Sequence, residues 1–446
     1  MSPVRKLEND HQVYGVMGNL RPHDVAFNPA TPACLSRDEA GRLTFRFLAP
    51  EDTEEALVVV RDGDDVSGHE MHLVGAAHDV SFWEVTIEPE ADQLRFSLAL
   101  RLEDGTPIYF GVTGVSGAIE RIDRFEVSVA DIVHHEVPDW MRGAVVYQIF
   151  PDRFASGDDS LTPEDALPWD AMPTRTGFHG GDLDGIAQNL DHLADMGVDL
   201  IYLNPIFAAP SNHRYDTSDY HTVDPMLGGN EAFERFVAAA HGRDIKVMLD
   251  VSLNHMHPTF PLFQDIIDKG KESDWAAWFD VREYPPHVMY RPDLIDDNEF
   301  WSQRIHKLQE LTGMDVIPVS SGPMLTASYD TWYGVPEMPR IDLQHPDARR
   351  YMIDIATHWV REYNIDGWRM DVVRYIDHDF WTDVREAVHA VRKDTYLLAE
   401  VMGDSRRWLQ GDEFDSTMNY TYREICIDFF GRRHISADEF VAAYLR

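Results

Sequence analysis

The sequence is poor in cysteine and in long apolar runs. Its 446 residues include only two cysteines, Cys34 and Cys426, which excludes a small framework held by several disulfides. No run of eighteen apolar residues is present, so no segment is expected to span a membrane as a helix. The first residues, MSPVRKLENDHQVYG, lack the apolar core of a secretory signal, and a cytoplasmic location is therefore expected.

Basic residues are also scarce. Lys and Arg number 39 against 78 Asp and Glu, and the formal net charge is −39. Nucleic acid and anionic membranes attract basic surfaces, so neither is expected as a partner. The charge suits a soluble protein acting on a neutral substrate, and solubility alone would also account for it. With 44% hydrophobic residues, the chain can form two or three globular domains.

The first part of the chain, residues 1–135, has the alternating pattern of β-strands. In RLTFRF, Leu43, Phe45 and Phe47 alternate with polar residues. ALVVVRDG, VSFWEVTI and QLRFSLAL are further short strands separated by turns that contain Asp and Gly. Strands at this spacing predict a β-sandwich.

After the polar linker DIVHHEVPDWMRG, short apolar runs alternate with amphipathic helical patterns. The expected strands are VVYQIF, DLIYLN, IKVMLD, DGWRMD, YLLAE and DSTMNY (415–420), and the first helix is expected to run from Ile186 to Met196 and end at Gly197. This alternation predicts a parallel sheet covered by helices, closed as a (β/α)8 barrel or open as a doubly wound sheet. No glycine-rich phosphate loop follows the first strand, which disfavours a nucleotide-binding sheet.

Acidic residues at the strand ends favour the barrel. Asp250, Asp371 and Glu400 each stand at the carboxyl end of a different strand. In a (β/α)8 barrel those ends surround one mouth, where active sites lie. A long segment rich in aromatic residues and proline follows the third strand and would overhang that mouth. The expected domains are a β-sandwich at 1–135, the first part of the barrel at 136–254, an inserted domain at 255–340 and the rest of the barrel, through a sixth strand, at 341–446.

The stretch GWRMD puts two opposite charges on one face of a strand. Residues two apart on a strand point to the same side, so Arg369 is expected to keep Asp371 ionised and to lower its pKa. Glu400 follows an apolar run, a setting that favours a protonated carboxyl. Neighbouring strand ends could bring the two carboxyls to about 5–5.5 Å, the separation that a retaining glycosidase needs. From these residues alone, an ion pair that only braces the barrel is an equally good interpretation.

Several motifs in order resemble those of the α-amylase family, glycoside hydrolase family 13. They are DVSLNH at 250–255, MPRIDLQHP at 338–346, GWRMD at 367–371 and the glutamate of LLAEVMGD at Glu400. YQIFPDRFASGD, GGDLDGIAQNLDHLADMG and FDSTMNY, with a β domain ahead of the barrel, are similar to the neopullulanase, cyclomaltodextrinase and maltogenic amylase branch. The resemblance implies retaining hydrolysis of α-1,4-glucosidic bonds in cyclodextrins, maltooligosaccharides, pullulan or starch, with transglycosylation as a side activity.

The resemblance also implies roles for single residues. Asp371 would be the nucleophile and Glu400 the acid and base. Tyr215 would stack on the sugar next to the cut, although without the motifs it reads as a core tyrosine. The other implied substrate-side residues are Arg369 and His255 at the same sugar, Asp250 and Asn254 as organisers of the mouth, and Arg374 beyond the cut. Without the motifs, His255 reads as a packed loop histidine.

Two further features are implied by the resemblance alone. No cofactor is required, but a structural calcium ion would lie near FASGDDS and GGD, where Asp158, Gly180 and Asp182 match ligand positions. Leu161 stands where an oxygen ligand is expected and cannot bind a hard cation, so an Asp-rich surface turn is the alternative. The second feature is a homodimer in which the amino-terminal domain of one chain lies over the mouth of the other.

One carboxylate of the family is missing. An Asp preceded by His, expected after a seventh strand, has no match between Glu400 and Arg446. A fragment of a longer protein, a partner chain that completes the barrel, and a pseudoenzyme that only binds α-glucans are the possible explanations. We favour the fragment, because an open six-stranded sheet would expose an unpaired edge. The chain alone would then be poorly soluble or inactive, and a His-Asp motif in frame downstream of codon 446 would exclude the pseudoenzyme.

Overall fold

The computed structural model divides into two compact units, and each is described by itself. One unit comprises Met1–Glu136 with Val401–Arg446, and the other comprises Val137–Glu400. None of the helices in the described part of the chain is long and apolar enough to cross a membrane. The structure describes residues 4–6, 25, 27–29, 32, 34–38, 40–62, 65–77, 80–132, 137–295 and 299–445.

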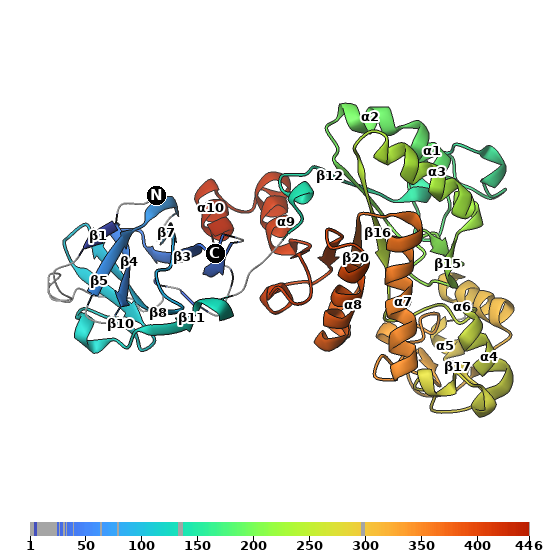
Figure 1. Cartoon of the computed structure of the whole chain (residues 1–446). Coiled ribbons are helices and arrows are strands. Elements are labelled where there is room, and N and C mark those ends of the chain that lie inside the picture. The colour runs from blue at the N-terminus through green and yellow to red at the C-terminus, as the bar shows by residue number, and fades with distance from the viewer. Residues whose placement is uncertain are drawn as a thin grey trace. The chain divides into compact units, whose positions relative to one another are not determined.

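Two antiparallel sheets form the main part of the first unit (Figure 1). The larger has the order β1-β5-β4-β8-β9-β10, with β11 paired to β8, and the smaller has the order β2-β3-β7-β6. Inward side chains of both sheets share one core, and Leu43, Phe45 and Phe47 of β3 are buried there, as the alternation predicts. The strands are β1 Val4–Lys6, β2 Leu35–Arg37, β3 Leu43–Pro50, β4 Thr53–Asp62, β5 Asp65–Glu70, β6 His72–Ala77, β7 Val80–Ile87, β8 Gln93–Leu102, β9 Pro107–Gly111, β10 Gly114–Ser116 and β11 Phe125–Ser128.

The carboxyl-terminal segment, 401–446, is described with this first unit. The strand expected at 415–420 is only two residues long, β22 at Ser416–Thr417. It is short because the side chain of Asn419 accepts a hydrogen bond from the Tyr422 amide at 2.9 Å and starts helix α9. The helices here are α9, Tyr420–Cys426, and α10, Ala437–Leu445, which contacts β6.

The second unit contains a parallel sheet in which neighbouring strands follow chain order. Strands β12, β13, β16, β20 and β21 pair in that sequence, without the reversal of order that defines a doubly wound sheet. Both faces are covered, so β13 and β20 are buried along their whole length. The strands are β12 Val146–Ile149, β13 Leu200–Leu203, β16 Lys246–Val251, β20 Gly367–Met370 and β21 Tyr396–Ala399. The order of these strands is that of a barrel wall.

Helices cover this sheet at the predicted places, with one difference (Figure 1). The helix expected from Ile186 to Met196 is two short helices, because Asn189 leaves helical geometry at ψ 9° and its side-chain amide donates to the Gly185 carbonyl. Met352, Ile355 and Trp359 form the buried stripe of α7. The helices are α1 Leu183–Gln188, α2 Leu190–Asp195, α3 Gly229–His241, α7 Pro346–Tyr363 and α8 His378–Val391.

A long insertion between β16 and α7 lies at one end of the parallel sheet (Figure 1). It carries a three-stranded sheet of order β18-β17-β19 and three helices. A backbone bridge between His255 and Arg340 joins its two ends. Its elements are α4 Pro261–Lys269, β17 His287–Tyr290, α5 Pro292–Ile295, α6 Glu299–Thr312, β18 Asp315–Pro318 and β19 Leu325–Ala327; a separate hairpin precedes it, β14 Phe207–Ala208 and β15 Asp219–Val223.

A buried carboxylate, Asp366, fixes the amino end of β20. It accepts hydrogen bonds from His241 Nε2 at 2.6 Å and the Val247 amide at 2.9 Å, and Lys246 Nζ lies 3.2 Å away. Burial opposes its ionisation, but these donors outweigh burial and lower its pKa. A lowered folded-state pKa stabilises the fold fully above the unfolded value of about 3.9, and this stabilisation is lost as pH falls through the folded value.

We therefore expect Asp366→Asn to lower the free energy of unfolding by about 2 kcal/mol at pH 7. The difference from the wild type should shrink progressively as pH falls below about 4 and through the lowered folded-state pKa, where the folded wild-type carboxyl is protonated too. Urea unfolding of the wild type and the variant at pH 7 and below about pH 4 measures this difference in the free energy of unfolding. Asp191→Asn, which changes an 83% exposed side chain, is the matched control and should have little effect. An undiminished difference at low pH would contradict this role for the charge.

Candidate active site

The predicted acidic residues come together because of strand register. Asp250 of β16 is the Cα partner of Arg369 of β20, and Arg369 is the partner of Leu398 of β21. Just past the strands, the Asp371 amide donates to the Val251 carbonyl, and the Glu400 amide donates to the Met370 carbonyl at 3.0 Å. These bonds hold Asp371 and Glu400 beside each other at the carboxyl edge of the sheet.

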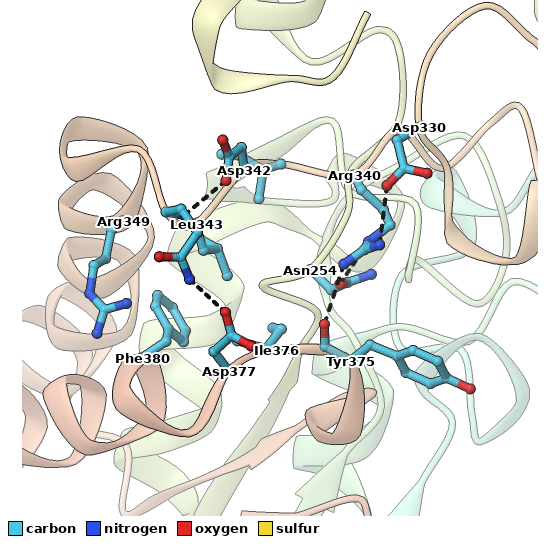
Figure 2. Close-up of a pocket in the computed structure, with 12 residues that line it drawn as sticks. Asn254, Asp330, Arg340, Asp342, Leu343, Arg349, Tyr375, Ile376, Asp377 and Phe380 are labelled. Carbon is cyan, nitrogen blue, oxygen red and sulfur yellow. Dashed lines mark hydrogen bonds and ion pairs between the residues drawn. The ribbon is translucent and has the colours of Figure 1, made fainter.

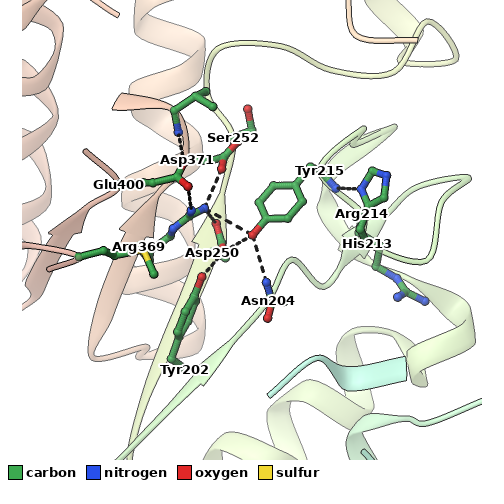
Figure 3. A network of polar contacts seen from close by, with 12 residues as sticks. Tyr202, Asn204, His213, Arg214, Tyr215, Asp250, Ser252, Arg369, Asp371 and Glu400 are labelled. Atoms are coloured by element: carbon green, nitrogen blue, oxygen red, sulfur yellow. Dashed lines mark hydrogen bonds and ion pairs between the residues drawn. The ribbon is translucent and has the colours of Figure 1, made fainter. Parts of the chain in front are cut away.

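One guanidinium group joins the three acids. Arg369 Nη1 lies 2.8 Å from Asp250 Oδ1 and 2.7 Å from Asp371 Oδ1, and Nη2 lies 2.9 Å from Glu400 Oε1 (Figure 3). The arginine side chain is only 4% exposed, whereas that of Glu400 is 17% exposed. The charges of GWRMD therefore belong to a larger cluster, in which the Asp371 and Glu400 carboxylates flank a single cation.

Two tyrosines support the cluster from the neighbouring strand and loop. The hydroxyl groups of Tyr202 and Tyr215 both donate to Asp250 Oδ2, the latter at 2.7 Å. Asn204 Nδ2 donates to the Tyr215 hydroxyl at 3.0 Å, and the Arg369 guanidinium lies 5.7 Å from the Tyr215 ring centre (Figure 3). The predicted residues Tyr215, Asp250 and Arg369 thus share one network with Asp371 and Glu400.

The pKa expected for Asp371 is wrong in direction. Burial raises the pKa of Asp371 to about 8; Arg369 opposes this, while the negative charges of Asp250 and Glu400 add to it. Burial also raises the pKa of Asp250, against the effect of Arg369 and the tyrosine hydroxyls. The sequence argument considered one arginine and one aspartate, but this arginine serves three carboxylates. Asp371 and Asp250 therefore hold a proton more tightly than exposed carboxyl groups do.

His255 and Asn254 form an adjoining wall. The His255 ring is 1% exposed, lies 5.5 Å from the Trp332 ring and is 3.1 Å from Asn254 Nδ2. Burial lowers the pKa of His255 to about 3, so the ring is neutral. Arg374 is exposed on the turn that follows Asp371. The roles of these three residues toward a sugar stay predictions.

Comparison with known proteins identifies the family. The family model described as the alpha amylase catalytic domain matches residues 148–445.

The chain belongs to the α-amylase family.

Curated relatives of this α-amylase-family chain have names from one branch. It is similar to a cyclomaltodextrinase of Geobacillus thermopakistaniensis (strain MAS1), 37% identical over 83% of this chain and 58% of that protein. It is also similar to an intracellular maltogenic amylase of Bacillus subtilis (strain 168), 35% identical over 82% of this chain and 57% of that protein. The chain thus spans a little over half the length of these relatives.

Solved structures of the α-amylase family agree with the fold. A cyclomaltodextrinase structure matches 95% of this chain and 68% of its own, with a TM-score of 0.78 and 29% identity. A maltogenic amylase from S. marinus matches 96% of this chain and 59% of its own, with a TM-score of 0.72 and 27% identity. These matches confirm the TIM-barrel class with an amino-terminal domain.

A pocket of about 220 Å³ lies between the insertion and the turn after Asp371 (Figure 2). Arg340 stands on its wall and donates to Asp330 Oδ2 at 3.1 Å, Asn254 Oδ1 at 3.3 Å and the Tyr375 carbonyl at 3.3 Å. Its guanidinium thus joins three segments. Its lining comprises Asn254, Asp330, Arg340, Ile341, Asp342, Leu343, Gln344, Arg349, Tyr375, Ile376, Asp377 and Phe380.

The residues predicted for calcium do not fit a cation. Asp182 is buried, and its two carboxylate oxygens accept from the backbone amides of Gly157, Asp158 and Gly185. The Asp158 carboxylate accepts from the amide and hydroxyl of Ser160. N–H donors therefore occupy the oxygens that calcium would need. The Gly180 carbonyl alone makes no site, and no cluster of three or more His, Cys, Asp or Glu suited to a metal ion occurs in the described ranges.

Sequence reasoning missed Tyr202 and Asn204. Asn204 directly follows the last residue of β13, just as Asp371 directly follows the last residue of β20. It also accepts from Gln148 Nε2 at 3.0 Å. A polar residue directly after an apolar strand was the available signal. Tyr202 gave less signal, because a tyrosine inside a strand fits an apolar core equally well.

Proposed function

We propose that the protein hydrolyses α-1,4-glucosidic bonds of neutral α-glucans with retention of configuration. The observation that carries the proposal is the pairing of Asp371 and Glu400 to the same Arg369 at the ends of adjacent strands. Two carboxyls across one cleft are what retaining hydrolysis requires. The arginine would fix both groups relative to the bond to be cleaved.

In the first step, an Asp371 oxygen attacks the anomeric carbon while the bond to the leaving oxygen breaks. Glu400, the more exposed of the two acids, gives its proton to that oxygen. In the second step, Glu400 takes a proton from water, and the water oxygen displaces Asp371 from the sugar. A sugar hydroxyl in place of water would give transglycosylation. Asp371 has to lose its proton before it attacks; burial opposes the ionised form and Arg369 favours it.

The names of the relatives suggest the substrates. Cyclomaltodextrinase, maltogenic amylase and neopullulanase are names of proteins 35–37% identical to this chain. Cyclodextrins, maltooligosaccharides, starch and pullulan are accordingly the proposed substrates, and the net charge of −39 suits uncharged polymers. Action inside the cell is proposed because one relative is named an intracellular enzyme. A homodimer through the amino-terminal domain stays a prediction.

A second candidate is α-glucan binding without catalysis. It is favoured by one observation, the raised pKa of Asp371, because a protonated carboxyl is a poor nucleophile. The site would then bind the sugar without forming a covalent bond to it.

Product analysis after incubation with maltoheptaose and β-cyclodextrin distinguishes the two candidates. The 446-residue chain is assayed beside a version extended through the genomic reading frame after codon 446. Hydrolysis by either version is the expected result and supports the enzyme. Binding of maltoheptaose by both versions without any product would favour the second candidate. Neither binding nor products would contradict both candidates.

A further inference from the structure

Val372, the residue after the proposed nucleophile, has an unfavourable backbone conformation. Its φ of 46° and ψ of 36° lie in the left-handed region. For a β-branched residue this conformation is a genuine outlier, because its side chain crowds the backbone there. The surrounding structure must hold such a residue in place, and residues held in this way cluster at active sites.

This left-handed residue lies where the chain leaves the parallel sheet after β20. The Glu400 amide donates to the Met370 carbonyl at 3.0 Å, which continues the ladder of hydrogen bonds between β20 and β21. At Val372 the chain turns away, and the Val372 carbonyl accepts from the Tyr375 amide at 2.9 Å. Val372 is only 9% exposed, so neighbouring groups enclose this turn.

The Val372 amide donates to a side chain in place of the next bond of the ladder. In a regular parallel ladder, the residue two after Met370 would donate to the backbone carbonyl of Glu400. Here the Val372 amide donates to Glu400 Oε2 at 3.1 Å. Arg369 Nη2 lies 2.9 Å from the other oxygen, Oε1 (Figure 3). Both carboxylate oxygens of Glu400 thus have an N–H donor, and the two donors belong to different residues.

We propose that Val372 is a positioning residue whose backbone amide orients the side chain of Glu400 for proton transfer. This inference rests on the proposed function. Arg369 alone would leave the Glu400 carboxyl group free to rotate about the bond between Cγ and Cδ, and the amide at the second oxygen restricts that rotation. An acid and base must lie within hydrogen-bond reach of the reacting oxygen, and a small displacement lowers the rate strongly. The left-handed backbone at Val372 is the strain that this arrangement requires.

A backbone ester at Val372 removes the hydrogen bond to Glu400 and keeps the side chain. Incorporation of 2-hydroxy-3-methylbutanoic acid replaces the Val372 N–H by an oxygen atom, in the 446-residue chain or its extended version, depending on which of them hydrolyses maltoheptaose. We expect kcat/KM for maltoheptaose, whose leaving oxygen needs a proton, to fall by about 10-fold or more. For α-maltosyl fluoride, whose fluoride leaves unaided, kcat/KM should change by less than about twofold.

Two controls separate the Val372 amide from the side chain and from a general loss of structure. Val372→Gly keeps the N–H and adopts the left-handed backbone readily, so the ratio of the two kcat/KM values should stay within about twofold of the wild type. A backbone ester at Val384, inside α8, removes a helical hydrogen bond instead. It should change kcat/KM for both substrates by the same factor.

The amide proton of Val372 reports the same hydrogen bond without an ester. In protein made with isotope-labelled valine, its NMR resonance is assigned by its absence from Val372→Gly. Glu400→Gln replaces a charged acceptor by a neutral one, which accepts a weaker hydrogen bond. The resonance should therefore move upfield in Glu400→Gln. This measurement tests the inference even if the ester variant does not fold.

The outcomes separate this inference from the proposed function. Where the wild type hydrolyses both substrates, an ester at Val372 that has no effect, or that lowers both kcat/KM values by one factor, would overturn the inference alone. An unchanged Val372 resonance in Glu400→Gln would overturn it as well. Absence of hydrolysis of both substrates by the wild type would contradict the proposed function and the inference together.

Discussion

Replacing Asp371 with asparagine is expected to lower kcat for maltooligosaccharide hydrolysis by at least about 10³-fold, because the amide cannot form the covalent bond to the sugar. Binding of maltoheptaose should persist, since the side chain keeps its shape. The assay uses the 446-residue chain or its extended version, depending on which of them hydrolyses the substrate. Asp394→Asn changes an exposed carboxylate before β21 and is the control. Retention of more than a tenth of wild-type kcat by Asp371→Asn would contradict the assigned nucleophile.

The same substitution should raise stability. Burial raises the folded-state pKa of Asp371 to about 8, above the unfolded value of about 3.9. Between these two values the folded state binds the proton more tightly, so the stability of the wild type falls as pH rises. Asp371→Asn removes this penalty. The variant should therefore have a higher Tm than the wild type at pH 8, and the gain should vanish near pH 4. Loss of activity together with a gain in stability would exclude misfolding as the cause of inactivity.

Replacing Arg369 with methionine is expected to lower the free energy of unfolding by about 3–5 kcal/mol at pH 7, because three buried carboxylates lose their shared cation. The loss should be smaller at acidic pH, where protonated carboxyls need no counter-charge. Thermal and urea unfolding measure it. Arg243→Met removes an exposed pair with Asp191 and should change stability by less than about 1 kcal/mol.

If Arg369→Met does not fold, the role of Arg369 can still be tested by changing its ion-pair partner Asp371 as well. Adding Asp371→Asn to Arg369→Met removes one of the uncompensated charges, so the double variant should be more stable than Arg369→Met alone. Wild-type stability of Arg369→Met, or no gain in the double variant, would contradict the view that the cluster depends on this arginine.

The parallel strands were predictable because their sequences carry two signals at once. Each is a short apolar run, as burial on both faces requires, and each ends next to a polar residue, as at Asp250, Asp371 and Glu400. The helix break at Asn189 and the helix start at Asn419 were missed, since each depends on a single side-chain hydrogen bond. Hydrophobic periodicity does not carry that information.

The site residues were partly predictable, whereas their electrostatics were not. The alternation of side chains predicts that Arg369 and Asp371 share a face, and they are in contact. Asp250 and Glu400 reach the same guanidinium through strand register, which the sequence does not state. Burial, with a smaller effect of these two negative charges, reverses the expected pKa shift of Asp371. The contact between Tyr333 and Tyr375 likewise joins segments 42 residues apart and depends on the path of the insertion.

The most direct test of the central claim is to capture the covalent sugar on Asp371. In a Glu400→Gln variant given α-maltosyl fluoride, the first step needs no acid, because fluoride leaves unaided, but the second step lacks its base. A glycosyl-enzyme should accumulate, and peptide mass spectrometry should find one maltosyl group on the peptide that contains Asp371. Absence of any adduct while fluoride is released, or an adduct on another residue, would contradict the pairing of Asp371 and Glu400 as nucleophile and acid.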